Sequence, residues 1–239
     1  MTIDYWLFLF ILFTTIFISV KKDKLTWGGG VTGAGIACCI FLGAGFRGLA
    51  MIGLFFLLGT VATSWQINAK EKLGAAEDNK GRRTAGQVVA NGGAAGILGL
   101  LSFFFPGQQN LFQLMMAAAI SSATADTLSS ELGTVYGKKF YNILSFQYDR
   151  PGENGVVSIE GMLFGIAGSM LIAIIYALGF GWTIGFWWIL VSGTVGNIAD
   201  SILGATVEKK RYLKNDSVNF MNTVAGALTA LILNQLLGS

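Results

Sequence analysis

Histidine is absent from this chain of 239 residues. Its absence excludes a histidine general base, a Ser-His-Asp triad and histidine metal ligands. The only two cysteines, Cys38 and Cys39, are adjacent, so they cannot plausibly form a structural disulfide with each other and are too few for a metal cluster. Charged residues make up 12% of the chain, against about 25% in an ordinary soluble domain. No basic stripe with interleaved aromatics is present, so we expect no nucleic-acid partner.

Apolar residues and glycine are abundant instead. Hydrophobic residues make up 53% of the chain, which has 33 glycines, 2 prolines and a mean hydropathy of +0.62. Small residues of this kind let transmembrane helices approach closely. The composition therefore predicts an all-α, polytopic membrane helix bundle that forms a single integral membrane domain over residues 1–239. The first apolar segment has no preceding basic region and no small-residue cleavage site, so we interpret it as a retained helix.

About eight transmembrane helices are expected, because a span needs roughly 17 to 25 apolar residues. The candidate spans cover residues 4–20, 27–45, 48–67, 86–105, 111–131, 157–178, 183–204 and 218–237. Three of the connections, 45–48, 105–111 and 178–183, are short and almost uncharged. The other four, 21–26, 68–85, 132–156 and 205–217, hold nearly all the charge.

The charged connections also set the expected orientation. Of the 16 basic residues, all except Arg47 fall in the four charged connections. Under the positive-inside rule, these four loops are cytoplasmic and both termini lie outside. We therefore expect an integral protein of a bacterial-type cytoplasmic membrane. Short echoes between residues 26–29 and 158–161, and between 59–64 and 196–201, are compatible with a parallel internal repeat of four spans each.

Polar clusters adjoin several spans near the expected cytoplasmic ends, and two contain acids within apolar segments. Helical spacing places one set of side chains on a common face of the fifth span: Ser122, Asp126, Ser129 and Ser130. A second set lies on one face of the seventh span: Asn197, Asp200, Ser201 and Gly204. Serine, threonine and asparagine in membrane helices often only form hydrogen bonds across an interface. An acid within a membrane span, in contrast, indicates function.

We expect Asp126, Glu131 and Asp200 to be catalytic residues and to hold Mg²⁺. Magnesium prefers oxygen ligands and is usually bound by one or two carboxylates together with substrate phosphates. Glu131 lies nearer the interface, where simple solvation is the alternative interpretation. The sequence did not show whether the Asp126 and Asp200 faces meet.

A phosphate site is expected at the start of the fourth span. Arg82 and Arg83 precede a helix N-terminus that contains Asn91, and arginine forks with free backbone amides bind phosphate well. Ordinary positive-inside anchoring is the alternative for the two arginines. The remaining candidate phosphate or nucleotide ligands are Ser130, Ser158, Ser201 and Asn219. The stretch 133–139 is not a P-loop, because its spacing is wrong and no Ser or Thr follows the lysine.

Five ordered motifs carry a family resemblance: GRRTAGQVVANGG, AxADTLSSELG, GxNGVVSxxG, ADSxLGA and NDxVNF. Together with the upstream LTWGGGVTGAG and LGTVATSW, they resemble the transmembrane protein 19 family, also known as domain of unknown function 92. The resemblance covers nearly the whole chain. The family includes a plant phytyl-phosphate kinase, so the resemblance implies phosphoryl transfer from a nucleotide, CTP by analogy with membrane lipid kinases, to an isoprenoid monophosphate.

Three functions are compatible with these residues and with what the resemblance implies. The first is a Mg²⁺-dependent isoprenoid-phosphate kinase, which needs no strong base because a phosphate ester with a second pKa of about 6 is already an anionic nucleophile near neutral pH. The second is a CTP-dependent lipid-phosphate cytidylyltransferase with the same metal site. The third is a transporter for a lipid or small anion, although a transporter would place its polar residues near the bilayer midplane. The residues select neither CTP over ATP, nor a prenyl chain length, nor an oligomeric state.

Overall fold

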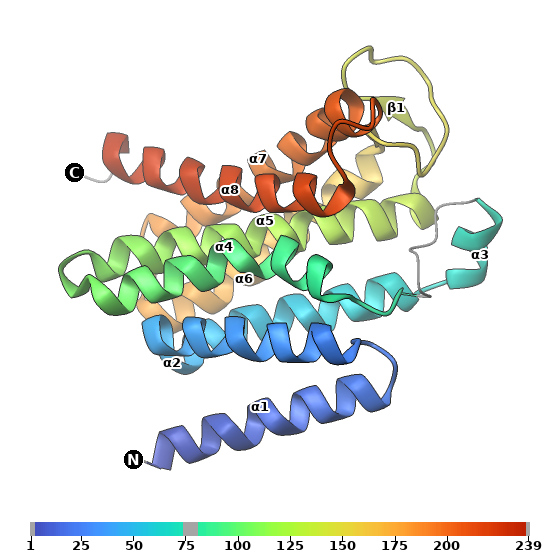
Figure 1. Ribbon diagram of the computed structural model, residues 1–239. Coiled ribbons are helices and arrows are strands. Elements are labelled where there is room, and N and C mark those ends of the chain that lie inside the picture. The colour runs from blue at the N-terminus through green and yellow to red at the C-terminus, as the bar shows by residue number, and fades with distance from the viewer. Residues whose placement is uncertain (1–2, 74–80, 238–239) are drawn as a thin grey trace.

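The computed structural model describes residues 3–73 and 81–237, and it confirms an all-α membrane bundle (Figure 1). The helices in chain order are α1 (Ile3–Lys21), α2 (Trp27–Ser64), α3 (Ile67–Lys72), α4 (Ala85–Phe104), α5 (Gln109–Tyr136), α6 (Ile159–Phe180), α7 (Gly185–Leu203) and α8 (Asn215–Leu237). A short 3-10 helix, η2 (Pro106–Gln108), precedes α5, and a π-helical turn, η3 (Gly204–Glu208), continues α7. Two short antiparallel strands, β1 (Tyr141–Asn142) and β2 (Val156–Val157), pair between α5 and α6.

Helix α2 contains two of the expected spans and reverses direction at Gly45. This glycine has φ 59° and ψ −148°, a conformation that is essentially restricted to glycine. Both ends of α2 consequently lie beside Arg83. The backbone amide of Thr26 donates to the Arg83 carbonyl at 3.0 Å, and Gly59 packs directly against the Arg83 guanidinium. The prediction of a loop over residues 45–48 is therefore wrong in detail. The two arms of α2 are joined by a single non-helical residue, Gly45.

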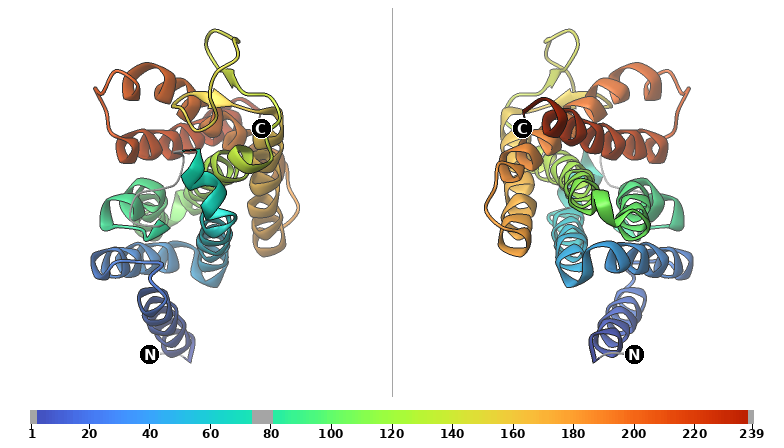
Figure 2. Two further views of the ribbon diagram at one scale, coloured as in Figure 1. Left: turned by 90° about the vertical axis from the view of Figure 1, so that its right-hand side faces the viewer. Right: turned by 90° about the vertical axis from the view of Figure 1, so that its left-hand side faces the viewer.

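Six helices in the described part of the chain are long and apolar enough to cross a membrane. Helix α2 is one of them and, at 38 residues with a reversal, it provides two crossings. Helix α5 is not among these six apolar helices. It has 28 residues, however, and lies at the centre of the bundle (Figure 2). It contacts α2, α4, α6, α7 and α8, which cover it on many sides, so it needs little apolar surface of its own. The expected count of about eight crossings is confirmed in this sense.

The charged connections gather at one end of the bundle. In Figure 1 the α1–α2 connection, α3 and the β1 region lie at the right, whereas both termini and the bend of α2 lie at the left. The expected loop 68–85 is partly helical because α3 lies within it, and its residues 74–80 fall outside the described residues. Arg47, the one basic residue expected at the opposite end, stacks there over the ring of Phe180 at 5.1 Å.

Glycines let the helices around α5 approach it closely. A Cβ added at Gly161 of α6 would lie 2.8 Å from the Ser129 carbonyl of α5, and one added at Gly133 of α5 would lie 2.8 Å from the Gly161 Cα. On the other side of α5, a Cβ at Gly196 of α7 would overlap the hydroxyl of Ser122. Close packing of this kind brings the polar faces of α5 and α7 into contact.

Two helix ends differ from the expected spans. Helix α5 continues to Tyr136 rather than ending at residue 131, so Glu131 lies more than one turn inside the helix. Helix α7 continues through η3 to Glu208, which places that acid on the helix instead of in the expected loop 205–217.

Candidate functional site

A polar cavity of about 650 Å³ lies at the charged end of the bundle. It is lined by α4, α5, α7, α8, η3 and the connection before α6. Every candidate site residue from the sequence lines this cavity except Arg82, so the structure brings these nine together: Arg83, Asn91, Asp126, Ser130, Glu131, Ser158, Ser201, Asp200 and Asn219. Residues far apart in the sequence therefore form one site, although their separate roles remain predictions.

The faces of α5 and α7 meet at a pair of carboxyl groups. The side chains of Asp126 and Asp200 lie against each other. Asn222 of α8 is fully buried and donates its amide Nδ2 to Asp200 Oδ1 at 2.9 Å. The Ser122 hydroxyl lies 3.0 Å from the backbone carbonyl and from Oδ1 of Asn222, and both oxygens accept from it. Three helices thus hold the two carboxyl groups together.

A third acid lies close to this pair. Glu208 of η3 is near enough to Asp126 and Asp200 to interact with both electrostatically. The side chains of Asn154 and Asn215, which also line the cavity, lie near this carboxylate. The three acids come from α5, α7 and η3, so elements far apart in the sequence bring them to one end of the cavity.

The donor set at Asp126 and Asp200 fits a hard divalent cation. Two carboxyl groups in contact repel each other when both are ionised, and a shared proton or a cation relieves that repulsion. Magnesium typically takes only one or two protein carboxylates and completes its shell with water and phosphate. Among the described residues no three metal-ligating side chains lie close enough together to hold an ion. The candidate site therefore offers a pair of carboxyl groups, with Glu208 nearby.

Glu131 does not join this pair. Its carboxylate forms a buried ion pair with Lys70 of α3, and the two side chains are only 8% and 1% exposed. The Lys70 ammonium group also donates to the carbonyl oxygens of Ala62 at 2.7 Å and Thr63 at 3.4 Å. Because a lysine neutralises Glu131 directly, the expected grouping of Glu131 with Asp126 and Asp200 around one metal ion is not what the geometry supports.

Arg83 lies at the cavity wall and is buried. Its guanidinium group lies 5.1 Å from the ring centre of Phe55 and 5.9 Å from that of Phe56. Its backbone joins the α1–α2 connection, because its amide donates to the Lys24 carbonyl at 3.0 Å. Arginine suits such a place, because its planar guanidinium group both packs on aromatic rings and binds oxyanions.

Arg82, in contrast, points away from the cavity. Its Nε donates to the Leu25 carbonyl at 3.3 Å, and its Nη1 lies 3.4 Å from the Asp23 carboxylate. The adjacent arginines therefore separate: Arg83 lines the cavity, whereas Arg82 ties down the connection between α1 and α2. The expected paired fork of Arg82 and Arg83 is not formed.

The start of α4 is capped by its own side chains. Thr84 and Gln87 form a capping box, in which Gln87 N donates to Thr84 Oγ1 at 3.4 Å and Thr84 N donates to Gln87 Oε1 at 2.9 Å. The Asp216 carboxylate lies beside Gly86 in the same turn, where a negative charge is favourable. This N-terminus is therefore partly occupied, and Arg83 is the better-placed anion ligand.

The remaining predicted ligands have local hydrogen bonds as well as cavity positions. Ser158 caps α6 by accepting from Gly161 N at 3.1 Å. Ser130 and Ser201 donate to carbonyls one turn earlier in their helices, at 2.9 Å and 3.2 Å. Asn219 donates to Asn215 Oδ1 at 3.3 Å. Each of these side chains could exchange its local bond for a ligand oxygen at small cost.

Comparison with known proteins assigns the chain to a family. Residues 10–227 match the family described as integral membrane protein DUF92. The chain belongs to the DUF92 family. A membrane protein of Synechocystis sp. is 32% identical over 90% of this chain and 84% of its own length, and one of Methanocaldococcus jannaschii is 31% identical over 90% and 89%.

A plant relative is also similar. The protein named VTE6, chloroplastic, of Arabidopsis thaliana is 31% identical over 86% of this chain, and the match spans 66% of the plant protein's length. No solved structure matches this DUF92 protein.

Three residues of this DUF92 site were not selected from the sequence. Lys70 was interpreted only as one of the loop charges, and no local pattern shows that it turns inward to Glu131. Glu208 was likewise placed in a loop, because a π-helical continuation has no clear sequence pattern. Asn222 is the third residue in a series with Asn215 and Asn219, and their helical spacing is the sequence signal that could have identified it.

Proposed function

We propose that this DUF92 protein is a prenyl-phosphate kinase. It would transfer the terminal phosphoryl group of a nucleoside triphosphate, CTP by family resemblance, to an isoprenoid monophosphate and release the prenyl diphosphate. The observation that carries the proposal is the gathering of Asp126, Asp200 and Arg83 around one polar cavity at the end of a membrane bundle. Carboxylates for a cation and an arginine for an oxyanion are the parts that phosphoryl transfer requires.

The reaction itself needs little acid or base. A non-bridging oxygen of the prenyl monophosphate attacks the γ-phosphorus of the nucleotide, and the bond from that phosphorus to the β–γ bridging oxygen breaks. The nucleoside diphosphate leaves with the bonding electrons. Because the attacking phosphate is already anionic near neutral pH, the absence of histidine is no obstacle.

The chain's own residues would position the charges. Arg83 would bind a phosphate oxygen, with its guanidinium plane held against Phe55 and Phe56. Asn222 would orient the Asp200 carboxylate through their 2.9 Å hydrogen bond. Asp126 and Asp200 would hold Mg²⁺, which supplies charge neutralisation on the phosphates. Glu131, paired with Lys70, would stabilise the docking of α3 on α5 instead of binding metal.

The direct test is a transfer assay with the purified full-length protein. A panel of prenyl monophosphates is incubated with γ-labelled CTP or ATP and Mg²⁺, and the lipid products are separated. We expect label in a prenyl diphosphate. Asp126→Asn and Asp200→Asn should each lower the rate by about 100-fold or more, since each removes a charge that neutralises the transferring group. Asp4→Asn, at the exposed start of α1, is the matched control and should retain full activity.

Product identity separates this proposal from the cytidylyltransferase. A kinase releases CDP and leaves no cytidine on the lipid, whereas a cytidylyltransferase releases pyrophosphate and leaves CMP attached. Labelling CTP in the base in one experiment and in the γ-phosphate in another distinguishes the two. Label from the base in the lipid product, or failure of every prenyl monophosphate to accept phosphate, would refute the kinase.

The transporter is less well supported by the position of the acids. The polar cavity is lined by the connections and helix ends at the charged end of the bundle, whereas a transport site is expected near the midplane. We propose that this end faces the cytoplasm, where nucleotides are available, and that both termini face outward.

A further inference from the structure

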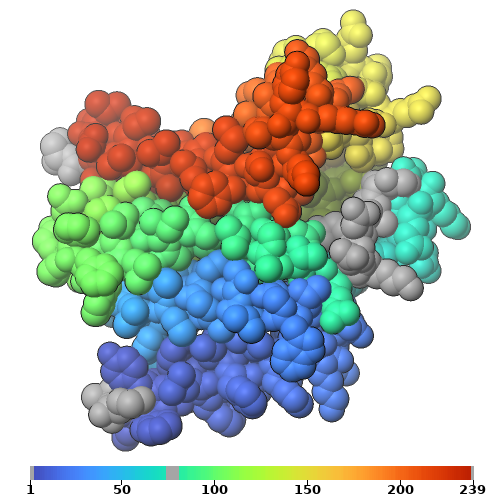
Figure 3. Space-filling view, in the orientation of Figure 1, coloured from blue at the N-terminus to red at the C-terminus, as the bar shows by residue number. Residues whose placement is uncertain are grey.

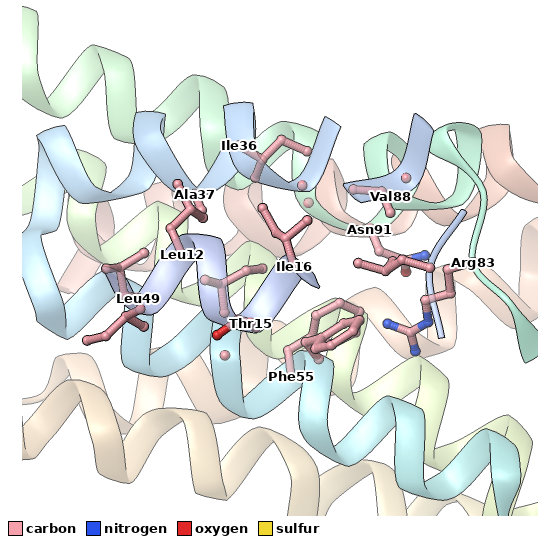
Figure 4. Close-up of a pocket in the computed structure, with 18 of the residues that line it drawn as sticks. Leu12, Thr15, Ile16, Ile36, Ala37, Leu49, Phe55, Arg83, Val88 and Asn91 are labelled. Carbon is pink, nitrogen blue, oxygen red and sulfur yellow. The ribbon is translucent and has the colours of Figure 1, made fainter. Parts of the chain in front are cut away.

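A second cavity lies on the other side of Arg83 and is almost entirely apolar. It has a volume of about 190 Å³ and is enclosed by α1, the two arms of α2 and the first turns of α4. Figure 4 shows Leu12 and Ile16 of α1 projecting into it, with Arg83 and Asn91 at one end and Leu49 at the other. The cavity therefore has one polar end and one apolar end.

The two cavities share a boundary. Arg83, Gln87 and Asn91 line both the apolar cavity and the polar cavity that contains Asp126 and Asp200. Asn91 donates its Nδ2 to the Gln87 carbonyl at 3.0 Å, while its buried Oδ1 has no partner within the described part of the chain. A buried amide oxygen without a partner is costly, and at this junction it could accept a hydrogen bond from a ligand or water.

Helix α1 forms the outer wall of the apolar cavity. It packs on α2 at two places: Phe8 stacks on Phe41 with ring centres 4.2 Å apart, and Ile16 and Val20 lie over Gly30. Only Phe8 and Ser19 of α1 are buried. In the space-filling view, α1 forms a separate outer layer along the arms of α2 (Figure 3), so the cavity lies near the surface that faces lipid.

We propose that this apolar cavity binds the hydrocarbon tail of the amphiphile whose phosphate is bound at Arg83. The inference rests on the proposed function for the headgroup, and it adds the location of the tail between α1, α2 and α4. An isoprenoid monophosphate has an anionic head joined to an apolar chain. The two adjoining cavities match that division, with a buried guanidinium at the junction and only hydrocarbon side chains at the far end.

Two glycines of α2 allow this placement to be tested with matched variants. A Cβ added at Gly53 or at Gly35 would meet no other atom within 4 Å. Gly53 lines the apolar cavity, whereas Gly35 does not. Gly53→Leu should therefore fill part of the tail site, and Gly35→Leu is a matched control with the same change on the same helix.

The experiment measures binding without nucleotide, so that it does not depend on catalysis. Purified full-length protein in nanodiscs is mixed with a farnesyl monophosphate carrying a diazirine on its tail, irradiated, and mapped by mass spectrometry. We expect labels on α1 and α2 residues of the apolar cavity. Excess unlabelled farnesyl monophosphate should compete for labelling, whereas inorganic phosphate or farnesol should compete much less well.

The glycine variants give the quantitative result. Gly53→Leu should weaken binding of the farnesyl probe by about tenfold, because methylenes of the tail lose their place in the cavity. The same variant should bind a short dimethylallyl monophosphate nearly as well as the parent protein. Gly35→Leu should bind both ligands unchanged.

Several outcomes would overturn the tail site. Labelling confined to the α6–α7 side would do so, as would the absence of specific labelling or equal effects of the two glycine variants. If the cavity is labelled but excess unlabelled farnesyl monophosphate does not reduce the labelling, the cavity binds bulk lipid chains instead. If the cavity is labelled as expected but no phosphoryl transfer occurs, the tail site stands and the kinase fails. If transfer occurs and the label lies elsewhere, the kinase stands and the tail site fails.

Discussion

Asn222 donates a 2.9 Å hydrogen bond to Asp200, and it does so from a fully buried position on α8. Its Oδ1 in turn accepts from Ser122 of α5 at 3.0 Å. One amide thus joins three helices and fixes the orientation of a carboxylate that touches Asp126. The position of the candidate metal ligands is consequently set by contacts between helices rather than by a loop.

Replacing this amide should weaken the site without removing a ligand. We expect Asn222→Ala to lower the rate of phosphoryl transfer by about 10- to 100-fold, the usual effect of losing a group that orients a metal ligand. The Mg²⁺ concentration needed for half-maximal activity should also rise. A purely structural defect would not change that concentration. Asn234→Ala, near the opposite end of α8, should leave both quantities unchanged. An unaltered Mg²⁺ dependence in Asn222→Ala would contradict the positioning role.

The buried ion pair between Lys70 and Glu131 predicts that the two single variants are less stable than the double variant. Lys70→Met leaves Glu131 buried and unpaired, and Glu131→Gln leaves Lys70 in the same condition, so each should destabilise the protein by about 3 to 5 kcal/mol. The double variant removes both charges and should recover a large part of that loss. Thermal unfolding of the purified protein in detergent measures all three.

The same variants distinguish an ion-pair role from a metal role for Glu131. If Glu131 bound Mg²⁺, the double variant would need much more Mg²⁺ for activity than the parent. We expect instead that the double variant keeps the parent's Mg²⁺ dependence, since its carboxylate pair at Asp126 and Asp200 is intact.

Close packing at Gly196 should be intolerant of even one methyl group. A Cβ there would overlap the Ser122 hydroxyl and lie 3.0 Å from the Asn222 carbonyl. Gly196→Ala should destabilise the protein by about 1 to 3 kcal/mol through overpacking and should also lower activity, because it separates α5, α7 and α8 at the site. Gly35→Ala, with open space around it inside α2, should instead stabilise the protein by about 0.5 to 1 kcal/mol, because alanine is the better helix former. Equal melting temperatures for the two variants would argue against this packing.

The orientation in the membrane can be tested with single cysteines. In a background with Cys38 and Cys39 replaced by Ala, Ser145→Cys marks the exposed loop after β1, and Gly107→Cys marks the exposed turn at the other end. A membrane-impermeant maleimide added to intact cells should label position 107 but not 145. Permeabilised cells should label both, and the reverse pattern in intact cells would invert the proposed topology.

Most of the fold could be predicted because its signals are local. The spans were visible as apolar runs of the length that a bilayer requires, and charge separated the two ends of the bundle. The turn at Gly45 was placed correctly but described as a loop, since the sequence does not show that one glycine is enough to reverse the helix. The extensions of α5 to Tyr136 and of α7 to Glu208 were missed, because polar residues at a helix end do not show whether the helix continues.

The site was predictable to the extent that acids are costly in a membrane. Asp126 and Asp200 were recognised on that ground alone, and Arg83 on its position before a helix. Arg82 and Glu131 have the same local sequence features, but their side chains have other partners. Arg82 pairs with Asp23, and Glu131 pairs with Lys70. Local sequence cannot separate such neighbours, because the difference lies in the partners that each side chain meets.

The sequence by itself determined that this chain is a membrane helix bundle with a polar, acidic end. Composition and hydropathy are sums over residues, so they need no knowledge of contacts. Only the tertiary structure decided which polar groups meet. In the folded protein, Asp126 lies against Asp200, and Glu131 forms an ion pair with Lys70. Arg83 lies between a polar and an apolar cavity. These relationships depend on helix packing at glycines, which fixes distances that no stretch of sequence contains.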